Sequence, residues 1–218
     1  MKNMVLFWGW TRNDRSYKSL IDSTPKGWKV YTLNYEDLMK AGWIDKLEEN
    51  VSQFLDKNNL GKIRLAGHSM GGALALEYAF QNPGRVKHLY LLDSSGVYGN
   101  ENIPYLIDNF FTSQSVYGFD REETLIENLR AVYRIFKNPI AHLKLAYYAY
   151  RVDLQDKAKK IKVSTTLIWA ANDKMTPLWQ GKKLHKLIKG SKLIVLPKTG
   201  HNWPMYKPEL FWENIKNG

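Results

Sequence analysis

The sequence predicts an α/β fold in which a mostly parallel sheet of about six strands carries helices on both faces. Short apolar runs alternate with segments of helical character along most of the chain. The apolar runs lack strict polar alternation, which is typical of parallel strands that are buried on both faces. The expected strands are residues 4–8, 30–33, 63–66, 86–92, 163–170 and 193–196.

The segments between these strands predict the helical layers. Helices are expected at 43–57, 72–81, 178–188 and 208–216. The second of these should end at Asn82-Pro83-Gly84, because proline and glycine interrupt a helix.

One long region interrupts the alternation. Between Gly96 and Lys160 no strand is expected, and two helices are expected at 122–136 and 139–151. The region is rich in aromatic residues. We expect a small helical cap of residues 97–160, inserted into a core formed by residues 1–96 and 161–218. These aromatic residues are Tyr98, Tyr105, Phe110, Phe111, Tyr117, Phe119, Tyr133, Phe136, Tyr147, Tyr148 and Tyr150.

Composition excludes several classes of protein. The 218 residues contain no cysteine, which rules out disulfides and thiolate-based metal sites. No apolar run approaches the roughly 20 residues of a membrane span, and the apolar start of the chain is too short for a signal-peptide core. We therefore expect a cytoplasmic protein without a membrane span.

The chain is strongly basic, with a net charge of +11. Lysines gather at 157–162 and 182–192. A solvated surface is the favoured interpretation, because no nucleic-acid-binding motif accompanies the charge. An acidic acyl carrier is the alternative partner, since a basic surface would attract it.

The segment Gly67-His68-Ser69-Met70-Gly71 has the pattern of a nucleophile elbow. It joins an expected strand to an expected helix, and such a tight turn projects the serine hydroxyl into the site. Glycines two residues before and two after the serine remove side chains that would clash in the turn. The following helix points its N-terminal N–H groups at a developing oxyanion. Ser69 is therefore the candidate nucleophile, and an ordinary glycine-rich turn is the competing interpretation.

A nucleophilic serine requires a histidine base, and His201 has the most suitable position. Catalytic groups of an open parallel sheet gather at the carboxyl ends of its strands. Only His201 lies in a loop just after an expected strand. His68 is adjacent to Ser69, and side chains adjacent in an elbow are expected to diverge. The chain has five histidines: His68, His88, His142, His185 and His201.

An orienting carboxylate should accompany this histidine. Asp173 follows the strand expected at 163–170, and Asp93 follows the strand expected at 86–92. Both lie at the correct edge of the sheet. We favour Asp173 as the acid and keep Asp93 as its competitor.

The order Ser69, Asp173, His201 resembles the α/β-hydrolase superfamily. The resemblance also includes segments 172–177 and 200–202, which look like the acid loop and histidine loop of that family. It extends over nearly the whole chain and implies a reduced α/β-hydrolase fold, without the two extra strands that many members carry ahead of the first strand expected here. Within the superfamily the motifs are similar to those of small microbial serine carboxylesterases, including those that cleave acyl-carrier methyl esters.

The resemblance also implies an oxyanion hole. The backbone N–H of Met70 would be one donor. Relatives carry a His-Gly-x segment after the first shared strand, and the residue after that glycine donates the second N–H. Trp8-Gly9-Trp10 occupies this place, so Trp10 is the implied donor and Trp8 stands where the histidine is usual.

We therefore expect a serine esterase for short or medium acyl chains or aromatic esters. The alternatives are C–C bond hydrolysis, lactone or amide cleavage, acyl transfer, or a hydrolase-fold binding protein without turnover. We expect a small-molecule ester as the substrate and no nucleic-acid partner. The protein should be a monomer or a small homo-oligomer. No organic cofactor or metal is expected, because no ligand cluster has suitable spacing.

Overall fold

The structure is a computed structural model, and it describes residues 1–33, 46–99, 108–109 and 121–215. Within these residues one sheet has six strands in the order β2-β1-β3-β4-β5-β6, and every neighbouring pair is parallel. The predicted parallel sheet is therefore confirmed. The strands are β1 (Lys2–Phe7), β2 (Trp28–Thr32), β3 (Ile63–His68), β4 (Val86–Leu92), β5 (Thr165–Ala170) and β6 (Lys192–Leu196).

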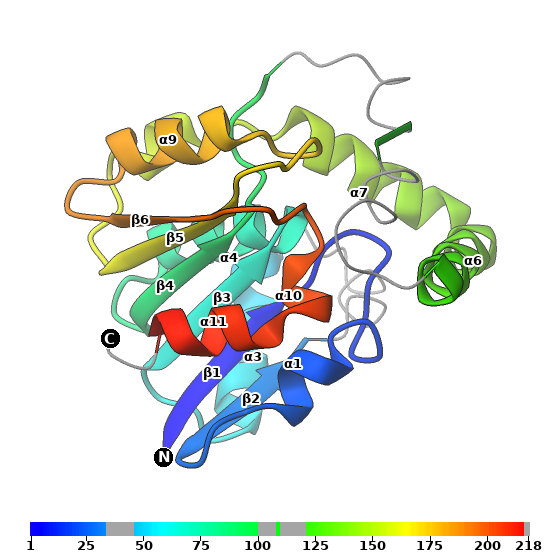
Figure 1. Cartoon of the computed structure of the whole chain (residues 1–218). Helices are drawn as coiled ribbons and strands as arrows, with labels where there is room; N and C mark the ends of the chain where they lie inside the picture. The colour runs from blue at the N-terminus through cyan, green and yellow to red at the C-terminus, as the bar shows by residue number, and fades with distance from the viewer. Residues whose placement is uncertain (34–45, 100–107, 110–120, 216–218) are drawn as a thin grey trace.

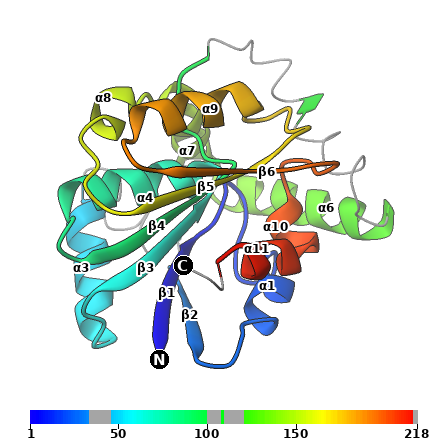
Figure 2. The same ribbon diagram turned by 60° about the vertical axis from the view of Figure 1, so that its left-hand side comes forward.

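Helices cover both faces of the sheet, as expected. In Figure 2, α3, α4, α8 and α9 lie on one side of the sheet and α1, α10 and α11 on the other, and contacts within each group agree with this division. The helices are α1 (Lys18–Asp22), α3 (Leu47–Lys57), α4 (Met70–Gln81), α6 (Arg121–Lys137), α7 (Pro139–Arg151), α8 (Gln155–Ala158), α9 (Leu178–Leu187), α10 (Trp203–Tyr206) and α11 (Pro208–Ile215).

The expected helical region between the fourth and fifth strands is present. Helices α6, α7 and α8 all lie between β4 and β5 in the chain, and in Figure 1 α6 and α7 stand outside the sheet. The two ends of the insertion meet where the N–H of Leu154 donates to the carbonyl of Gly96 at 2.8 Å. Residues 100–107 and 110–120, with several of the predicted cap aromatics, lie outside the described residues. The proposed boundary between core and cap stays a prediction.

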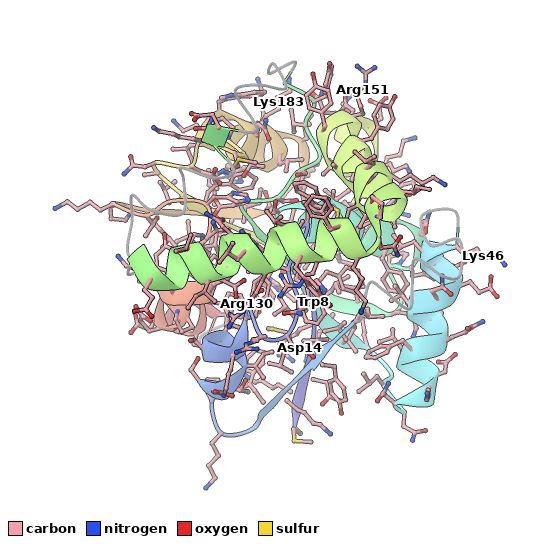
Figure 3. The ribbon with its side chains drawn as sticks, turned by 90° about the vertical axis from the view of Figure 1, so that its right-hand side faces the viewer. Trp8, Asp14, Lys46, Arg130, Arg151 and Lys183 are labelled. Atoms are coloured by element: carbon pink, nitrogen blue, oxygen red, sulfur yellow. The ribbon has the colours of Figure 1, made fainter. Side chains whose placement is uncertain are left out.

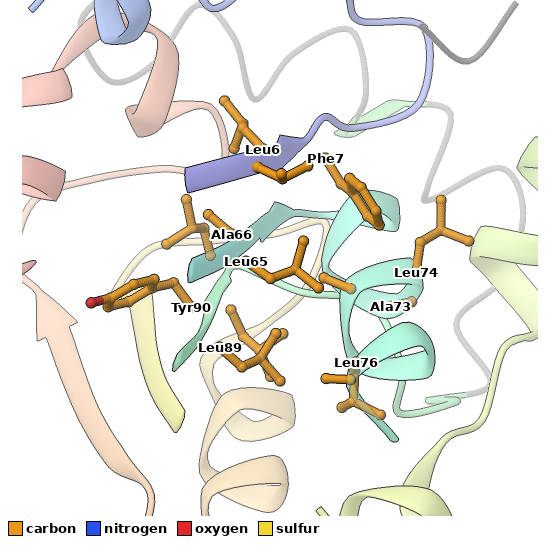
Figure 4. Packing of buried hydrophobic residues seen from close by; sticks show 14 of the residues in the cluster. Leu6, Phe7, Leu65, Ala66, Ala73, Leu74, Leu76, Leu89 and Tyr90 are labelled. Atoms are coloured by element: carbon orange, nitrogen blue, oxygen red, sulfur yellow. The ribbon is translucent and has the colours of Figure 1, made fainter. Parts of the chain in front are cut away.

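The hydrophobic core lies between the central strands and α4. Figure 4 shows Phe7, Leu65 and Leu89 on three neighbouring strands, with Ala73 and Leu76 of α4 beside them. Most of α4 is buried, and its first turns carry small side chains, so the helix can approach the sheet closely. This packing fixes the start of α4, which directly follows Ser69. No helix among the described residues is both long and apolar enough to cross a bilayer.

Candidate active site

Ser69 lies between the end of β3 and the start of α4, where the elbow was predicted. Its backbone has φ 56° and ψ −124°, a strained conformation for a residue with a side chain. The neighbouring chain holds this conformation. The N–H of Ser69 donates to the carbonyl of Leu92 at 3.0 Å, and the N–H of Ser95 donates to the carbonyl of Ser69 at 2.9 Å.

The two glycines of the motif have the close contacts that the turn requires. A Cβ atom on Gly67 would lie 2.6 Å from the carbonyl carbon of Gly71. A Cβ atom on Gly71 would lie 2.6 Å from the carbonyl carbon of Phe7. Both obstacles are backbone, so neither can move aside as a flexible side chain could. The glycine pattern thus reflects tight packing of the turn against β1 and α4.

Asp173 and His201 form a buried pair at the carboxyl ends of β5 and β6. Oδ2 of Asp173 lies 2.7 Å from Nδ1 of His201, and each residue is 6% exposed. The N–H groups of Met175 and Thr176 donate to Oδ1 of Asp173 at 2.7 and 2.9 Å, and the Thr176 hydroxyl donates to Oδ2 at 2.8 Å. Because the carboxylate accepts the Nδ1 proton, Nε2 of the neutral imidazole is the nitrogen that can accept another proton. Sequence reasoning did not identify Thr176 as part of this arrangement.

Asp93, the competing acid, has a different environment. It is fully buried, and its oxygens accept hydrogen bonds from the N–H of Ala170 at 2.8 Å and from the indole of Trp203 at 2.5 Å. Burial, followed by the negative charge of Asp173, raises the pKa of Asp93 well above its ordinary value. The carboxyl that contacts the His201 imidazole nitrogen at hydrogen-bond distance is that of Asp173.

The His68 side chain contacts the loop that carries His201. Nε2 of His68 lies 2.8 Å from the carbonyl oxygen of His201, and the two rings are 4.8 Å apart. Since a carbonyl only accepts, Nε2 carries the proton, and Nδ1 accepts from the Tyr17 hydroxyl at 2.5 Å. Burial, and then the nearby His201, lower the pKa of His68 well below its ordinary value. His68 is thus a neutral link between two loops.

The same link reaches the segment that follows β1. The N–H of Gly9 donates to the Tyr17 hydroxyl at 3.0 Å. A Cβ atom on Gly9 would lie 3.4 Å from the Cβ of Ser69, so this segment lies directly beside the elbow. Trp8 is 3% exposed and stacks on Tyr17, with ring centroids 6.2 Å apart. Trp8 therefore supports the loop by packing.

We expect His68→Ala to lower kcat about ten- to a hundred-fold with little change in KM, because the loop carrying His201 loses its anchor. Steady-state kinetics would measure this split. His68→Gln should recover part of kcat, since its amide N–H can reach the His201 carbonyl. Equal losses for the two variants would exclude this anchoring role.

The two candidate oxyanion donors come from these same segments. Met70 is the first residue of α4, and the first N–H groups of a helix have no carbonyl acceptor within that helix. Trp10 follows Gly9, and its indole N–H donates to the carbonyl of His142 in α7 at 3.1 Å. The Trp10 side chain is therefore held by the helical insertion, while its backbone continues the loop beside Ser69.

A buried charge cluster also joins the insertion to this loop. The Glu127 carboxylate of α6 lies 3.6 Å from the Arg12 guanidinium and 2.6 Å from that of Arg130, and accepts from the Ser16 hydroxyl at 3.0 Å. Burial opposes ionisation of Glu127, but these three partners together hold its pKa below its ordinary value. Arg134 donates to the carbonyl of Thr11 at 2.6 Å. The insertion thus contributes to positioning the loop that contains Trp10.

Three buried side chains near the site could in principle act as metal ligands. One potential ligand atom from each of His68, Asp93 and His201 lies within 4.8 Å of the others. Hydrogen bonds already account for both nitrogens of His68 and both oxygens of Asp93. The grouping is therefore explained by the network that links the loops.

The chain is similar in sequence and in fold to known hydrolases. A sequence model of the alpha/beta hydrolase family matches residues 9–213. An uncharacterized hydrolase of Bacillus subtilis, YugF, is 31% identical over 208 residues, covering 86% of this chain and 72% of the relative. A 2-hydroxy-6-oxononadienedioate/2-hydroxy-6-oxononatrienedioate hydrolase of Pseudomonas putida is 26% identical over 229 residues, covering 91% of this chain and 78% of the relative. The crystal structure of an alpha/beta hydrolase from a lagoon-sediment metagenome aligns with a TM-score of 0.72 at 22% identity, covering 99% of this chain and 89% of that one.

Proposed function

Since the chain belongs to the alpha/beta hydrolase family, we propose that it is a serine hydrolase that cleaves carboxylic esters with short, medium or aromatic acyl groups. In this proposal Ser69 is the nucleophile, His201 the base and Asp173 the orienting acid. The observation that carries it is the buried Asp173–His201 pair, whose loop is anchored through His68 to the strained turn at Ser69.

The proposed reaction proceeds through an acyl-enzyme. Nε2 of His201 takes the hydroxyl proton as Oγ of Ser69 attacks the ester carbonyl, and the N–H groups of Met70 and Trp10 bind the resulting oxyanion. His201 then protonates the leaving alcohol as the C–O bond breaks. Water attacks the acyl-enzyme by the same route, which releases the carboxylic acid and restores Ser69. Throughout, Asp173 stabilises the protonated imidazole.

An aromatic side chain near the proposed site favours a substrate with an apolar acyl or alcohol group. Trp10 is half-buried beside the proposed site, and its indole contacts α7. Aromatic side chains of this kind supply large apolar contact area for an acyl chain or an aromatic ring.

Carbon–carbon bond hydrolysis is the second candidate. It is favoured by the similarity to the Pseudomonas putida hydrolase, whose name gives 2-hydroxy-6-oxononadienedioate as a substrate. The same serine, histidine and aspartate could serve either reaction, because each begins with an activated oxygen attacking a carbonyl. The insertion and its contacts would then determine which leaving group is accepted.

A substrate panel separates the two candidates. The purified chain would be assayed on p-nitrophenyl esters of increasing acyl length, and on 2-hydroxy-6-oxononadienedioate by loss of its absorbance. We expect kcat/KM to be highest on a short, medium or aromatic ester. A higher kcat/KM on the dienedioate would replace the ester proposal with carbon–carbon hydrolysis, and no turnover on either set would contradict both.

A further inference from the structure

The helical insertion exposes a continuous run of large apolar side chains. Eight of the eleven large hydrophobic residues that are exposed within the described part of the chain lie on α6 and α7. We call this set the outer face of the insertion. Its members are Leu125, Ile126, Leu129, Tyr133 and Phe136 on α6, and Ile140, Leu143 and Tyr147 on α7.

The spacing of these residues shows that each helix presents one apolar stripe. On α6 they follow one another by one, three, four and three positions, and on α7 by three and four, which places them along one side of each helix. Only Asn138 separates the two helices, so Phe136 and Ile140 connect the stripes. The opposite side of α6 carries Glu127, which is buried against Arg12 in the loop that follows β1. Figure 3 views the molecule from this side, with α6 across the front.

The charges that accompany this face are almost all positive. Residues 128–152 contain no Asp or Glu, and they contain five basic residues. The exposed acid Glu122 lies at the distant, N-terminal end of α6. Three of the basic side chains are exposed beside the apolar stripes. They are Lys137, Lys144 and Arg151.

We propose that the outer face of the insertion docks on an anionic lipid surface. Amphipathic helices with an apolar stripe, aromatic residues and flanking cations bind in the plane of a membrane interface, with the apolar side chains in the headgroup region. Tyr133 and Tyr147 suit that position, because a tyrosine has an apolar ring and a polar tip. Lys137 and Lys144 would contact the negative headgroups.

Charge distinguishes this occupant from a second copy of the chain. A symmetric dimer would bring the same positively charged face of two chains together. Like charges in an interface oppose association, whereas an anionic membrane neutralises them. The proposal concerns a surface on the outside of α6 and α7 and does not depend on the reaction assigned to Ser69.

Vesicle binding of the purified full chain tests the proposal. Co-sedimentation would be measured with vesicles of phosphatidylcholine alone and of phosphatidylcholine mixed with phosphatidylglycerol, at low and high salt. We expect binding to the anionic vesicles that weakens with salt, and little binding to the neutral ones. Absence of binding to the anionic vesicles would overturn the proposal.

Paired variants separate this face from the general positive charge of the protein. Lys137→Glu with Lys144→Glu should weaken binding to anionic vesicles roughly ten-fold or more, and Phe136→Ser with Tyr147→Ser should also weaken it. Lys182→Glu with Lys183→Glu makes the same change in net charge on α9, and it should have a much smaller effect. Equal effects of the two charge variants would contradict docking through α6 and α7.

The same variants test whether a second copy of the chain, and not a lipid surface, covers the outer face of the insertion. Circular dichroism and ester turnover without vesicles should be unchanged in Phe136→Ser with Tyr147→Ser, because both side chains are largely exposed. Sedimentation velocity would show whether the wild-type chain dimerises. A dimer that these substitutions dissociate would assign the outer face to a second copy and overturn the lipid proposal.

Discussion

Replacing Ser69 with alanine is expected to lower kcat/KM on the best ester about ten thousand-fold or more, because the proposed acyl-enzyme can no longer form. Alanine keeps the Cβ atom, so the strained backbone at this position is retained and the elbow should remain folded. Any remaining rate would come from the oxyanion donors and from substrate binding.

A matched serine provides the control for this variant. Ser19 is an exposed residue of α1, and Ser19→Ala should have wild-type kinetics. Thermal unfolding should be similar for both variants. A Ser69→Ala protein that is folded and retains most of its ester turnover would show that another group is the nucleophile.

The second large loss of activity is expected on replacing Asp173. Comparing it with the loss on replacing Asp93 shows which carboxyl orients the base. Asp173→Asn should lower kcat about a thousand- to ten-thousand-fold, since an amide cannot stabilise the imidazolium and favours the wrong imidazole tautomer. Asp93→Asn should lower kcat less than about ten-fold, because the Asp93 oxygens accept from the Ala170 N–H and the Trp203 indole, whereas the His201 imidazole contacts Asp173. Steady-state kinetics on one ester would compare the two.

The reverse ranking of these two variants would contradict the assignment of Asp173 as the acid. If Asp93→Asn loses far more activity than Asp173→Asn, then Asp93 is the acid that supports the base. Similar large losses would show that the two carboxyls act as one unit. Thermal unfolding of both variants would identify any loss that comes from misfolding, since both residues are buried.

The sheet could be predicted because its strands carry a strong local signal. The expected strand at 86–92 coincides with β4, and the other five differ from β1, β2, β3, β5 and β6 by about two residues at their ends. Central strands are buried on both faces, so they are apolar throughout and differ clearly from the helices. The short helices α1, α8 and α10 were not predicted, since four or five residues give too few turns for a periodic pattern.

The candidate residues Ser69, Asp173 and His201 could be found because parallel topology brings the carboxyl ends of strands to one edge. Both aspartates follow a strand, so their position does not separate them, and the likeness of residues 172–177 to the family's acid loop favours Asp173. The contact between Asp173 and His201 adds a physical reason. The rise in the pKa of Asp93 depends on burial and on the proximity of Asp173, which local sequence does not encode.

The link through Tyr17 and His68 was missed for a related reason. These residues are 51 positions apart, and nothing in their spacing indicates a contact. The sequence predicts a strand that ends at residue 66, which places His68 in a turn. In the structure β3 continues through His68, and its side chain is held between Tyr17 and the His201 carbonyl.

Covalent labelling tests the central proposal, that Ser69 is an activated nucleophile, most directly. The wild-type chain would be treated with a fluorophosphonate probe, analysed by intact mass and peptide mapping, and assayed for ester turnover in parallel. We predict a single adduct on the peptide that contains Ser69, loss of turnover in step with labelling, and no adduct on Ser69→Ala. Labelling at another residue, or full turnover by a chain in which Ser69 is labelled, would contradict the proposal.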